Sequence, residues 1–269
     1  MSEYLLPVLI LLGTGAFAGI LAGLLGVGGG IILVPAFLLV FTQAGFGGPD
    51  VMQVCLATSL ATIIVTSIRS VLAHHRRGAV DWNILRNYAP GIAVGAVLGV
   101  MVVQALRTQT LQLVFAVLVV IIATYMAMSR PHWRLGDRMP RGWLQGVISL
   151  CTGFISVLLG IGGGSIGVPL MTLHGIAIHR AVATAAGFGI LIAAPSVATF
   201  LFVPAQNAPP LTIGSVNVAA FLVTIAMTLM TAPLGAALAH RTDAARLKRY
   251  FAIFLFLVAL NMLRKVLIG

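Results

Sequence analysis

Two glycine-rich segments hold the residues best suited to binding a ligand. Residues 24–35 read LLGVGGGIILVP, and residues 158–169 read LLGIGGGSIGVP. Three consecutive glycines are unfavourable in an apolar helix, because each costs about 1 kcal/mol relative to alanine. An unwound turn inside a membrane also leaves backbone groups unpaired, and it is tolerated only where protein, water or a ligand satisfies them. The paired segments therefore predict broken helices in equivalent positions of two halves, with a binding site between them.

The chemistry that these segments favour is anion binding. A helix that begins at a glycine turn presents free N–H groups and the positive end of its dipole to whatever lies before it. Ser165 adds a hydroxyl donor at the position where the first copy has Ile31. The predicted substrate-binding residues of the two segments are Gly28, Gly29, Gly30, Gly162, Gly163, Gly164 and Ser165. The alternative is that these glycines only allow helices to pack closely.

Hydroxyl side chains in the apolar segments that follow the glycines are a second set of candidates. Thr58 and Ser59 lie in the first half, and Thr184 is the counterpart of Thr58 in the second half. Such hydroxyls can donate hydrogen bonds to the oxygens of an anion. They can equally bond carbonyl groups of their own helix, and the sequence leaves both roles open.

Three arginines are candidates for a gate or an inner vestibule. Arg69 lies inside an apolar span, and a charge in that position is a functional hypothesis by default. Arg76 and Arg77 follow about two turns later in a basic cluster. The alternative for Arg69 is that its guanidinium reaches the membrane surface along its own helix.

The acidic residues exclude several kinds of chemistry. The chain has five of them, and all fall at predicted helix ends or in loops: Glu3, Asp50, Asp81, Asp137 and Asp243. The sequence therefore argues against a carboxylate proton relay in mid-membrane and favours an anionic substrate. Neither a nucleophile with a nearby base nor a metal-ligand cluster occurs, so we predict no enzyme activity, no metal and no cofactor.

Composition places the chain in a membrane. Hydrophobic residues make up 60% of the sequence and charged residues only 8%, in apolar runs long enough to cross a bilayer. The net charge of +11 comes mostly from short basic segments between those runs. We therefore expect a small anionic substrate and membrane lipid as partners and no nucleic acid. The sequence makes no prediction of oligomeric state.

The apolar runs predict an all-α polytopic membrane protein with five elements in each half. The second element of each half has only 11 or 12 residues, which is too short to cross a bilayer upright, so we read it as a half-helix or re-entrant arm. The predicted elements are residues 4–26, 30–41, 51–73, 82–104, 108–128, 143–160, 164–174, 180–203, 216–239 and 247–267.

Basic residues predict the orientation of these elements. With the N-terminus outside, almost every basic cluster falls on the cytoplasmic side, as expected for a membrane protein. An odd number of elements in each half then turns the second half upside down relative to the first. We therefore predict an inverted-topology repeat, with residues 1–129 and 143–269 as the two repeats and 130–142 as a cytoplasmic linker.

The duplicated GxGGG motif, each copy followed by a proline, and the Ala57-Thr58 and Ala183-Thr184 pairs resemble the TauE/SafE-type sulfite exporters, also called toluene sulfonate uptake permeases. The resemblance covers essentially the whole chain. It implies a multi-pass transporter of the bacterial inner membrane, with a periplasmic N-terminus in the orientation given above. It also implies small sulfur-containing anions as substrates, such as sulfite, thiosulfate, sulfoacetate or organosulfonates, and it favours export.

Alternating access around a site at the bilayer midplane is the mechanism that we expect from the paired broken helices. A gated anion channel would use the same helix ends and is the main competing hypothesis. A membrane-embedded enzyme would need a nucleophile with a base, or a metal cluster. A purely structural membrane subunit would leave the paired glycine breaks unexplained.

Overall fold

The computed structural model describes the chain except for residues 1–4, 26–28, 129–132, 240–243 and 269. In the described part, ten helices and one short antiparallel hairpin form the fold, which confirms the predicted all-α membrane class. The elements are α1 Leu5–Leu25, α2 Gly30–Gln43, α3 Val51–His75, α4 Trp82–Ala105, α5 Thr108–Met128, α6 Trp143–Leu158, α7 Gly164–Leu173, α8 Ile178–Leu201, β1 Thr212–Ile213, β2 Val216–Asn217, α9 Val218–Ala239 and α10 Ala244–Ile268.

Helix length separates spanning helices from half-helices. Within the described residues, α3, α4, α5 and α8 are long and apolar enough to cross a membrane, with 21 to 25 residues each. By contrast, α2 has 14 residues and α7 has 10. At a rise of 1.5 Å per residue these two helices extend about 21 and about 15 Å, well short of the roughly 30 Å hydrocarbon layer.

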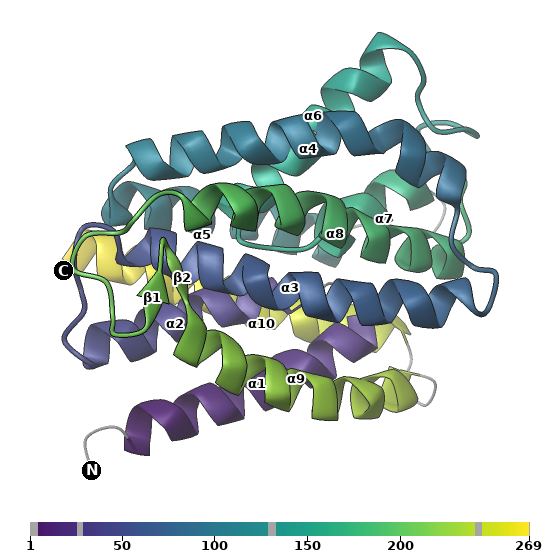
Figure 1. Cartoon of the computed structure of the whole chain (residues 1–269). Helices are drawn as coiled ribbons and strands as arrows, with labels where there is room; N and C mark the ends of the chain where they lie inside the picture. Colours follow the sequence, from purple (N-terminus) through teal and green to yellow (C-terminus); the bar gives the residue numbers. More distant parts are fainter. Residues whose placement is uncertain (1–4, 26–28, 129–132, 240–243, 269) are drawn as a thin grey trace.

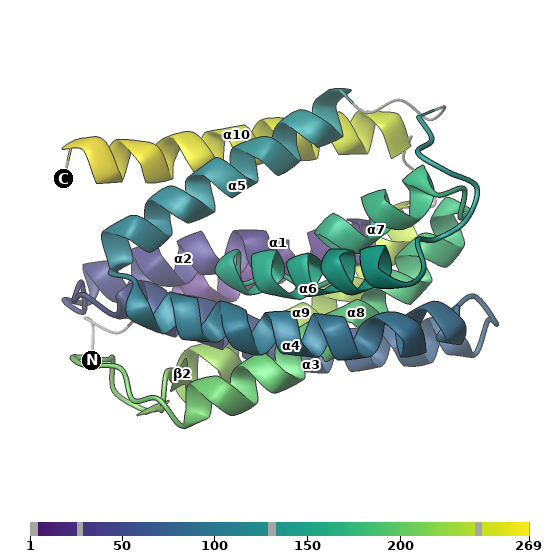
Figure 2. The same cartoon turned by 90° about the horizontal axis from the view of Figure 1, so that it is seen from above.

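The helices form a bundle around two buried ones. Helices α3 and α8 pack against each other in the interior, α1 pairs with α9, and α4 pairs with α6 (Figure 1). Helices α5 and α10 pair on one side of the bundle (Figure 2). Glycines allow the tight pairs: a side chain at Gly95 would overlap the Leu150 carbonyl oxygen, and one at Gly19 would overlap Thr231. Glycines recur every four residues in these helices, at Gly15 and Gly19 of α1 and at Gly91, Gly95 and Gly99 of α4, and this spacing serves helix contact.

The bundle has two ends, which we name by their segments. At the hairpin end lie β1 and β2, together with the α2–α3 and α4–α5 turns. There, the Thr108 N–H donates to the Pro49 carbonyl at 2.9 Å, and the Gln206 N–H donates to Asp50 Oδ2 at 3.0 Å. At the linker end lie residues 133–142 and the α3–α4 and α7–α8 turns (Figure 1). Helix α1 begins and α10 ends at the hairpin end.

Both half-helices turn back toward the end from which the preceding helix came. Helix α6 begins at the linker end, directly after residues 133–142. The last residue of α7, Leu173, accepts a hydrogen bond from Leu135 N–H at 2.7 Å, so α7 returns to that end. Helix α2 likewise ends at the hairpin end, where α1 begins (Figure 1). The short second element of each half is therefore re-entrant.

Candidate functional site

The second glycine segment is an open turn between α6 and α7. Gly160 has a φ of +57°, a conformation that favours glycine. Its carbonyl accepts a hydrogen bond from Ser59 Oγ of α3 at 2.8 Å. The next residue, Ile161, donates its N–H to the Ser156 carbonyl at 3.0 Å. The turn is thus fixed both to α3 and to the end of α6.

The first glycine segment also interrupts its helix. Helix α1 ends at Leu25 and α2 begins at Gly30. Gly29, with a φ of +71°, precedes α2, and its carbonyl accepts the N–H groups of Ile32 and Leu33 at 3.0 and 3.2 Å. Gly28, the first candidate residue of this segment, lies outside the described residues.

The two breaks touch each other. A Cβ at Gly30 would overlap the Gly160 carbonyl oxygen and lie 3.0 Å from Ile161 Cα. From the other side, a Cβ at Gly160 would lie 2.7 Å from Val34 of α2 and 2.9 Å from Leu56 of α3. The structure therefore brings the two predicted segments together, alongside the buried middle of α3.

Close packing is a real role of these glycines. A Cβ at Gly163 would overlap Cβ of Phe188 on α8 and lie 2.7 Å from the Ala185 carbonyl oxygen. Gly162 and Gly164 are also buried. The packing role that the sequence left open is therefore present at Gly30, Gly160 and Gly163, whatever else these residues do.

The start of α7 carries unpaired donors. Its first backbone hydrogen bond joins Gly167 N–H to the Gly163 carbonyl at 2.7 Å. Among the described residues, nothing accepts from the preceding N–H groups of Gly164, Ser165 and Ile166. The Ser165 side chain is buried, with the residue 9% exposed, and its Oγ has no partner in the described part of the chain. This helix end can therefore bind an acceptor, and its dipole favours a negatively charged one.

Thr58 and Thr184 join helices of opposite halves. Thr184 Oγ1 of α8 accepts the N–H of Asp81, the residue that caps α4, at 2.9 Å. Thr58 Oγ1 of α3 accepts the N–H of Asn217, just before α9, at 3.0 Å. Both threonines are fully buried. We call these two contacts the clasps; they give both predicted hydroxyls a structural partner.

The helix-capping residues of the two clasps are also alike. The Asp81 carboxylate accepts the N–H groups of Asn83 and Ile84, and the Asn217 side-chain oxygen accepts that of Ala220 at 2.9 Å. The two clasps differ in charge. Arg180 lies 3.3 Å from Asp81, whereas neutral Asn217 donates to the Pro210 carbonyl and to Thr212.

The remaining candidates are Ser59 and the three arginines. Ser59 is fully buried, and its hydroxyl already donates to Gly160. Arg69 is exposed near the linker end of α3, and Arg76 and Arg77 are exposed in the turn that follows. The structure thus places Ser59 at the breaks and the three arginines toward the linker end.

The described acidic residues lie at helix ends or in loops, as the sequence predicts. Asp50 and Asp81 precede α3 and α4, and Asp137 lies in the segment before α6. Glu3 and Asp243 fall outside the described residues. In the described part of the chain, no cluster of histidine, cysteine or acidic side chains is suited to a metal ion.

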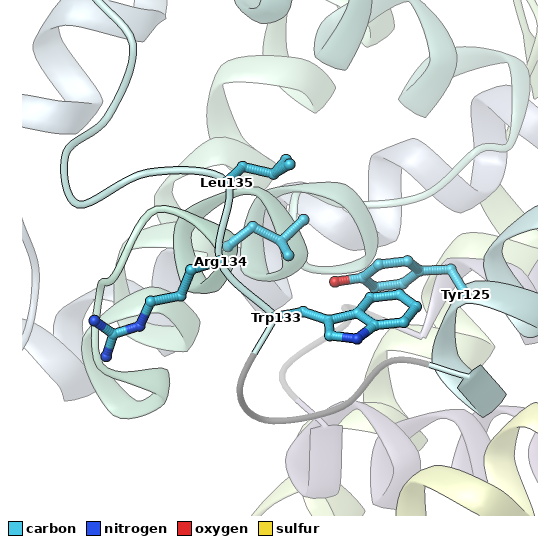
Figure 3. A pocket seen from close by; sticks show the side chains of 5 residues that line it. Tyr125, Trp133, Arg134 and Leu135 are labelled. Atoms are coloured by element: carbon cyan, nitrogen blue, oxygen red, sulfur yellow. The ribbon is translucent and has the colours of Figure 1, made fainter.

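A surface cavity lies at the linker end, away from the glycine segments. It has a volume of about 470 Å³ and is lined by Tyr125, Trp133, Arg134, Leu135 and Leu173. The Arg134 side chain extends away from the two aromatic rings, as Figure 3 shows. Arg134 instead lies 3.8 Å from Asp137. Among the described residues that line the cavity, none therefore directs a cation toward the aromatic rings.

Sequence reasoning missed two features of this region. Ser156, near the end of α6, is fully buried with an unpartnered hydroxyl among the described residues. The contacts of Asp81 with Thr184 and of Asn217 with Thr58 were missed as well. Asp81 and Asn217 are separated by 136 residues, close to the 134-residue offset between the glycine segments, so comparison of the halves could have paired them. No sequence signal marks Ser156, because its lack of a partner is a property of the folded chain.

Comparison with known proteins identifies the family. The family model described as "Sulfite exporter TauE/SafE" matches residues 11–262. A probable membrane transporter protein of Haemophilus influenzae is 32% identical over 260 residues, covering 96% of this chain and 98% of the relative. A probable membrane transporter protein of Methanocaldococcus jannaschii is 30% identical and covers 69% of each chain. No solved structure matches the chain. The chain is a multi-pass membrane transporter, and it belongs to the sulfite exporter TauE/SafE family.

Proposed function

We propose that this transporter moves small sulfur-containing anions, such as sulfite, thiosulfate, sulfoacetate or organosulfonates, and that it exports them. In this proposal the anion binds at the start of α7, beside the two glycine breaks. The observation that carries this proposal is that, among the described residues, neither the buried hydroxyl of Ser165 nor the first N–H groups of that helix end have a hydrogen-bond partner. An unpaired buried polar group costs about 1 to 3 kcal/mol, so a ligand that pairs with it gains affinity.

Electrostatics support an anion over a cation. The positive end of the α7 dipole faces the break, and the described carboxylates lie at the bundle ends rather than beside the glycines. Exposed arginines gather at the linker end, where they raise the local concentration of anions: Arg76, Arg77, Arg134, Arg138, Arg141 and Arg180. The family description supports sulfite chemistry and export.

The transport mechanism that we propose is alternating access by two inverted repeats, residues 1–129 and 143–269, joined by the linker 130–142. Three equivalences support the repeat. Helix α1 packs on α9 as α6 packs on α4, a re-entrant arm follows the first helix of each half, and the two clasps pair equivalent residues. The described basic residues favour a cytoplasmic linker end, and hence a periplasmic N-terminus in the bacterial inner membrane.

Flux measurements with purified protein in liposomes test this function. Sulfite, thiosulfate, sulfoacetate, an aryl sulfonate and chloride are compared, with and without pH and sodium gradients. We expect saturable flux of at least one sulfur anion, faster than that of chloride. Flux that does not saturate, with chloride passing equally well, would identify a channel, and absence of flux for every sulfur anion would reject the proposal.

Ser165→Ala is the matching variant. It removes one hydroxyl donor to a charged ligand, so we expect KM for the transported anion to rise about tenfold or more. Thr172→Val is the control on the same helix, because the Thr172 hydroxyl donates to the Val168 carbonyl at 2.9 Å within α7. Equal KM values for the two variants would remove Ser165 from the site.

A further inference from the structure

A second unpartnered hydroxyl flanks the same break. Among the described residues, four buried side-chain polar atoms have no hydrogen-bond partner: Gln53 Oε1, Ser156 Oγ, Ser165 Oγ and Thr224 Oγ1. Two of these four belong to serines on either side of the α6–α7 turn. Ser156 is 0% exposed, so bulk water does not offer its hydroxyl a partner.

The other hydroxyls of α6 show that this helix normally satisfies such groups. Ser149 Oγ donates to the Gly146 carbonyl at 3.0 Å, and Thr152 Oγ1 donates to the Ile148 carbonyl at 2.7 Å. A serine in a helix usually makes such a bond one turn back. Among the described residues, Ser156 has no such partner, although it lies on the buried face of the same helix, one turn beyond Thr152. The described part of the chain therefore leaves this hydroxyl unpaired, although a carbonyl one turn back is the usual acceptor.

Ser156 is also fixed firmly to the turn. Its own carbonyl accepts the N–H of Ile161 at 3.0 Å, directly after Gly160. The Gly160 carbonyl is in turn held by Ser59 at 2.8 Å. Because these hydrogen bonds join Ser156 to the turn, Ser156 keeps a defined position relative to the glycines and moves with the turn.

The first half offers no equivalent hydroxyls. The 134-residue offset between the glycine segments relates Ser156 to Ala22 and Ser165 to Ile31. Both hydroxyls near the breaks that lack a partner among the described residues thus come from the second half. The site is therefore asymmetric even though the glycine motif is repeated.

We infer that Ser156, which precedes the turn, donates a second hydroxyl hydrogen bond to the anion in addition to the one from Ser165, which follows the turn. The inference rests on the proposed function and deepens it. Donors on both sides of the turn suit an anion whose charge is spread over several oxygens, so Ser156 contributes to selection of an oxyanion over a halide. An unpaired buried hydroxyl lowers the stability of the empty protein, and the bound oxyanion satisfies it.

Ser156→Ala separates ligand binding from a structural role. Removal of an unpaired buried hydroxyl should leave the melting temperature unchanged or raise it. The same change should raise KM for sulfite or thiosulfate about tenfold. It should also make each oxyanion a weaker inhibitor of transport of the other, while inhibition by chloride stays unchanged. Ser149→Ala is the matched control, because that serine has a partner within α6 and should leave KM unchanged.

Ser156→Cys keeps a donor at this position, but its thiol is somewhat larger than the hydroxyl and donates a weaker hydrogen bond. It should fold like wild type and give a KM between those of the wild type and Ser156→Ala. If wild-type protein transports sulfite or thiosulfate and neither Ser156 variant changes KM, the role of Ser156 is refuted while the function stands. If wild-type protein transports neither anion, both proposals fail. A lower melting temperature with unchanged KM would instead assign Ser156 to packing.

Discussion

Gly163 shows how little room the second break leaves for any side chain. A Cβ there would overlap Phe188 Cβ and approach the Ala185 carbonyl oxygen of α8. We expect Gly163→Ala to destabilise the protein by about 1 to 3 kcal/mol, because the overlap forces the turn or α8 to move. Thermal unfolding of the purified protein in detergent measures this effect.

Gly146→Ala is the control for that prediction. Gly146 is exposed on α6, and nothing lies within 4 Å of an added Cβ. Alanine there should be neutral or stabilising by up to about 1 kcal/mol. Equal melting temperatures for the two variants would contradict the tight packing described at Gly163. Any substitution at Gly163 disturbs packing, so substitutions of the serines are better tests of ligand binding.

The clasps connect elements of opposite halves. Thr184→Val removes the acceptor for the Asp81 N–H while keeping the shape of the buried side chain. We expect a loss of about 1 to 3 kcal/mol in the free energy of unfolding, because a backbone donor at the start of α4 loses its partner. Thr58→Val, at the other clasp, should behave similarly.

Thr199→Val provides the comparison on α8. Its hydroxyl donates to the Pro195 carbonyl of the same helix at 2.9 Å, so its removal leaves the contacts between halves intact. Denaturant unfolding of the three variants tests the clasps. If Thr199→Val lowers the free energy of unfolding as much as Thr184→Val does, the clasp adds no stability of its own.

The helices were predictable because charges and turn-forming residues separate the apolar runs. The prediction for α5, residues 108–128, is confirmed at both ends, and the short α2 and α7 follow from the glycine motif. The β1–β2 hairpin was not predicted, since its strands have only two residues each and depend on distant contacts. One such contact joins Ser215 N–H to the Phe200 carbonyl at 3.0 Å.

The candidate site was predictable in part, because its glycines form a motif that the sequence shows directly. Repeated glycines mark both breaks in the sequence, and the absence of a hydroxyl at Ile31 distinguishes Ser165. The contact between Gly30 and Gly160 and the unpartnered state of Ser156 depend on which helices meet. Local periodicity does not contain that information, because helices from distant parts of the chain form these contacts.

At the scale of the whole molecule, two re-entrant arms meet at the centre of the bundle from opposite ends. Exposed arginines gather at the linker end. The β-hairpin lies at the other end (Figure 1). A solute bound at the α7 helix end would therefore lie between two chemically different ends. In the proposed cycle, the two halves move about this site and open one end at a time.

Direct location of a bound anion tests the central claim. Selenite replaces sulfite with a heavier atom that anomalous X-ray scattering identifies in crystals of the transporter. The account predicts a selenium site within hydrogen-bonding reach of Ser165 Oγ and the first N–H groups of α7, lost in Ser165→Ala. Selenium bound only among the linker-end arginines or in the cavity beside Trp133, with none at the glycine breaks, would contradict it.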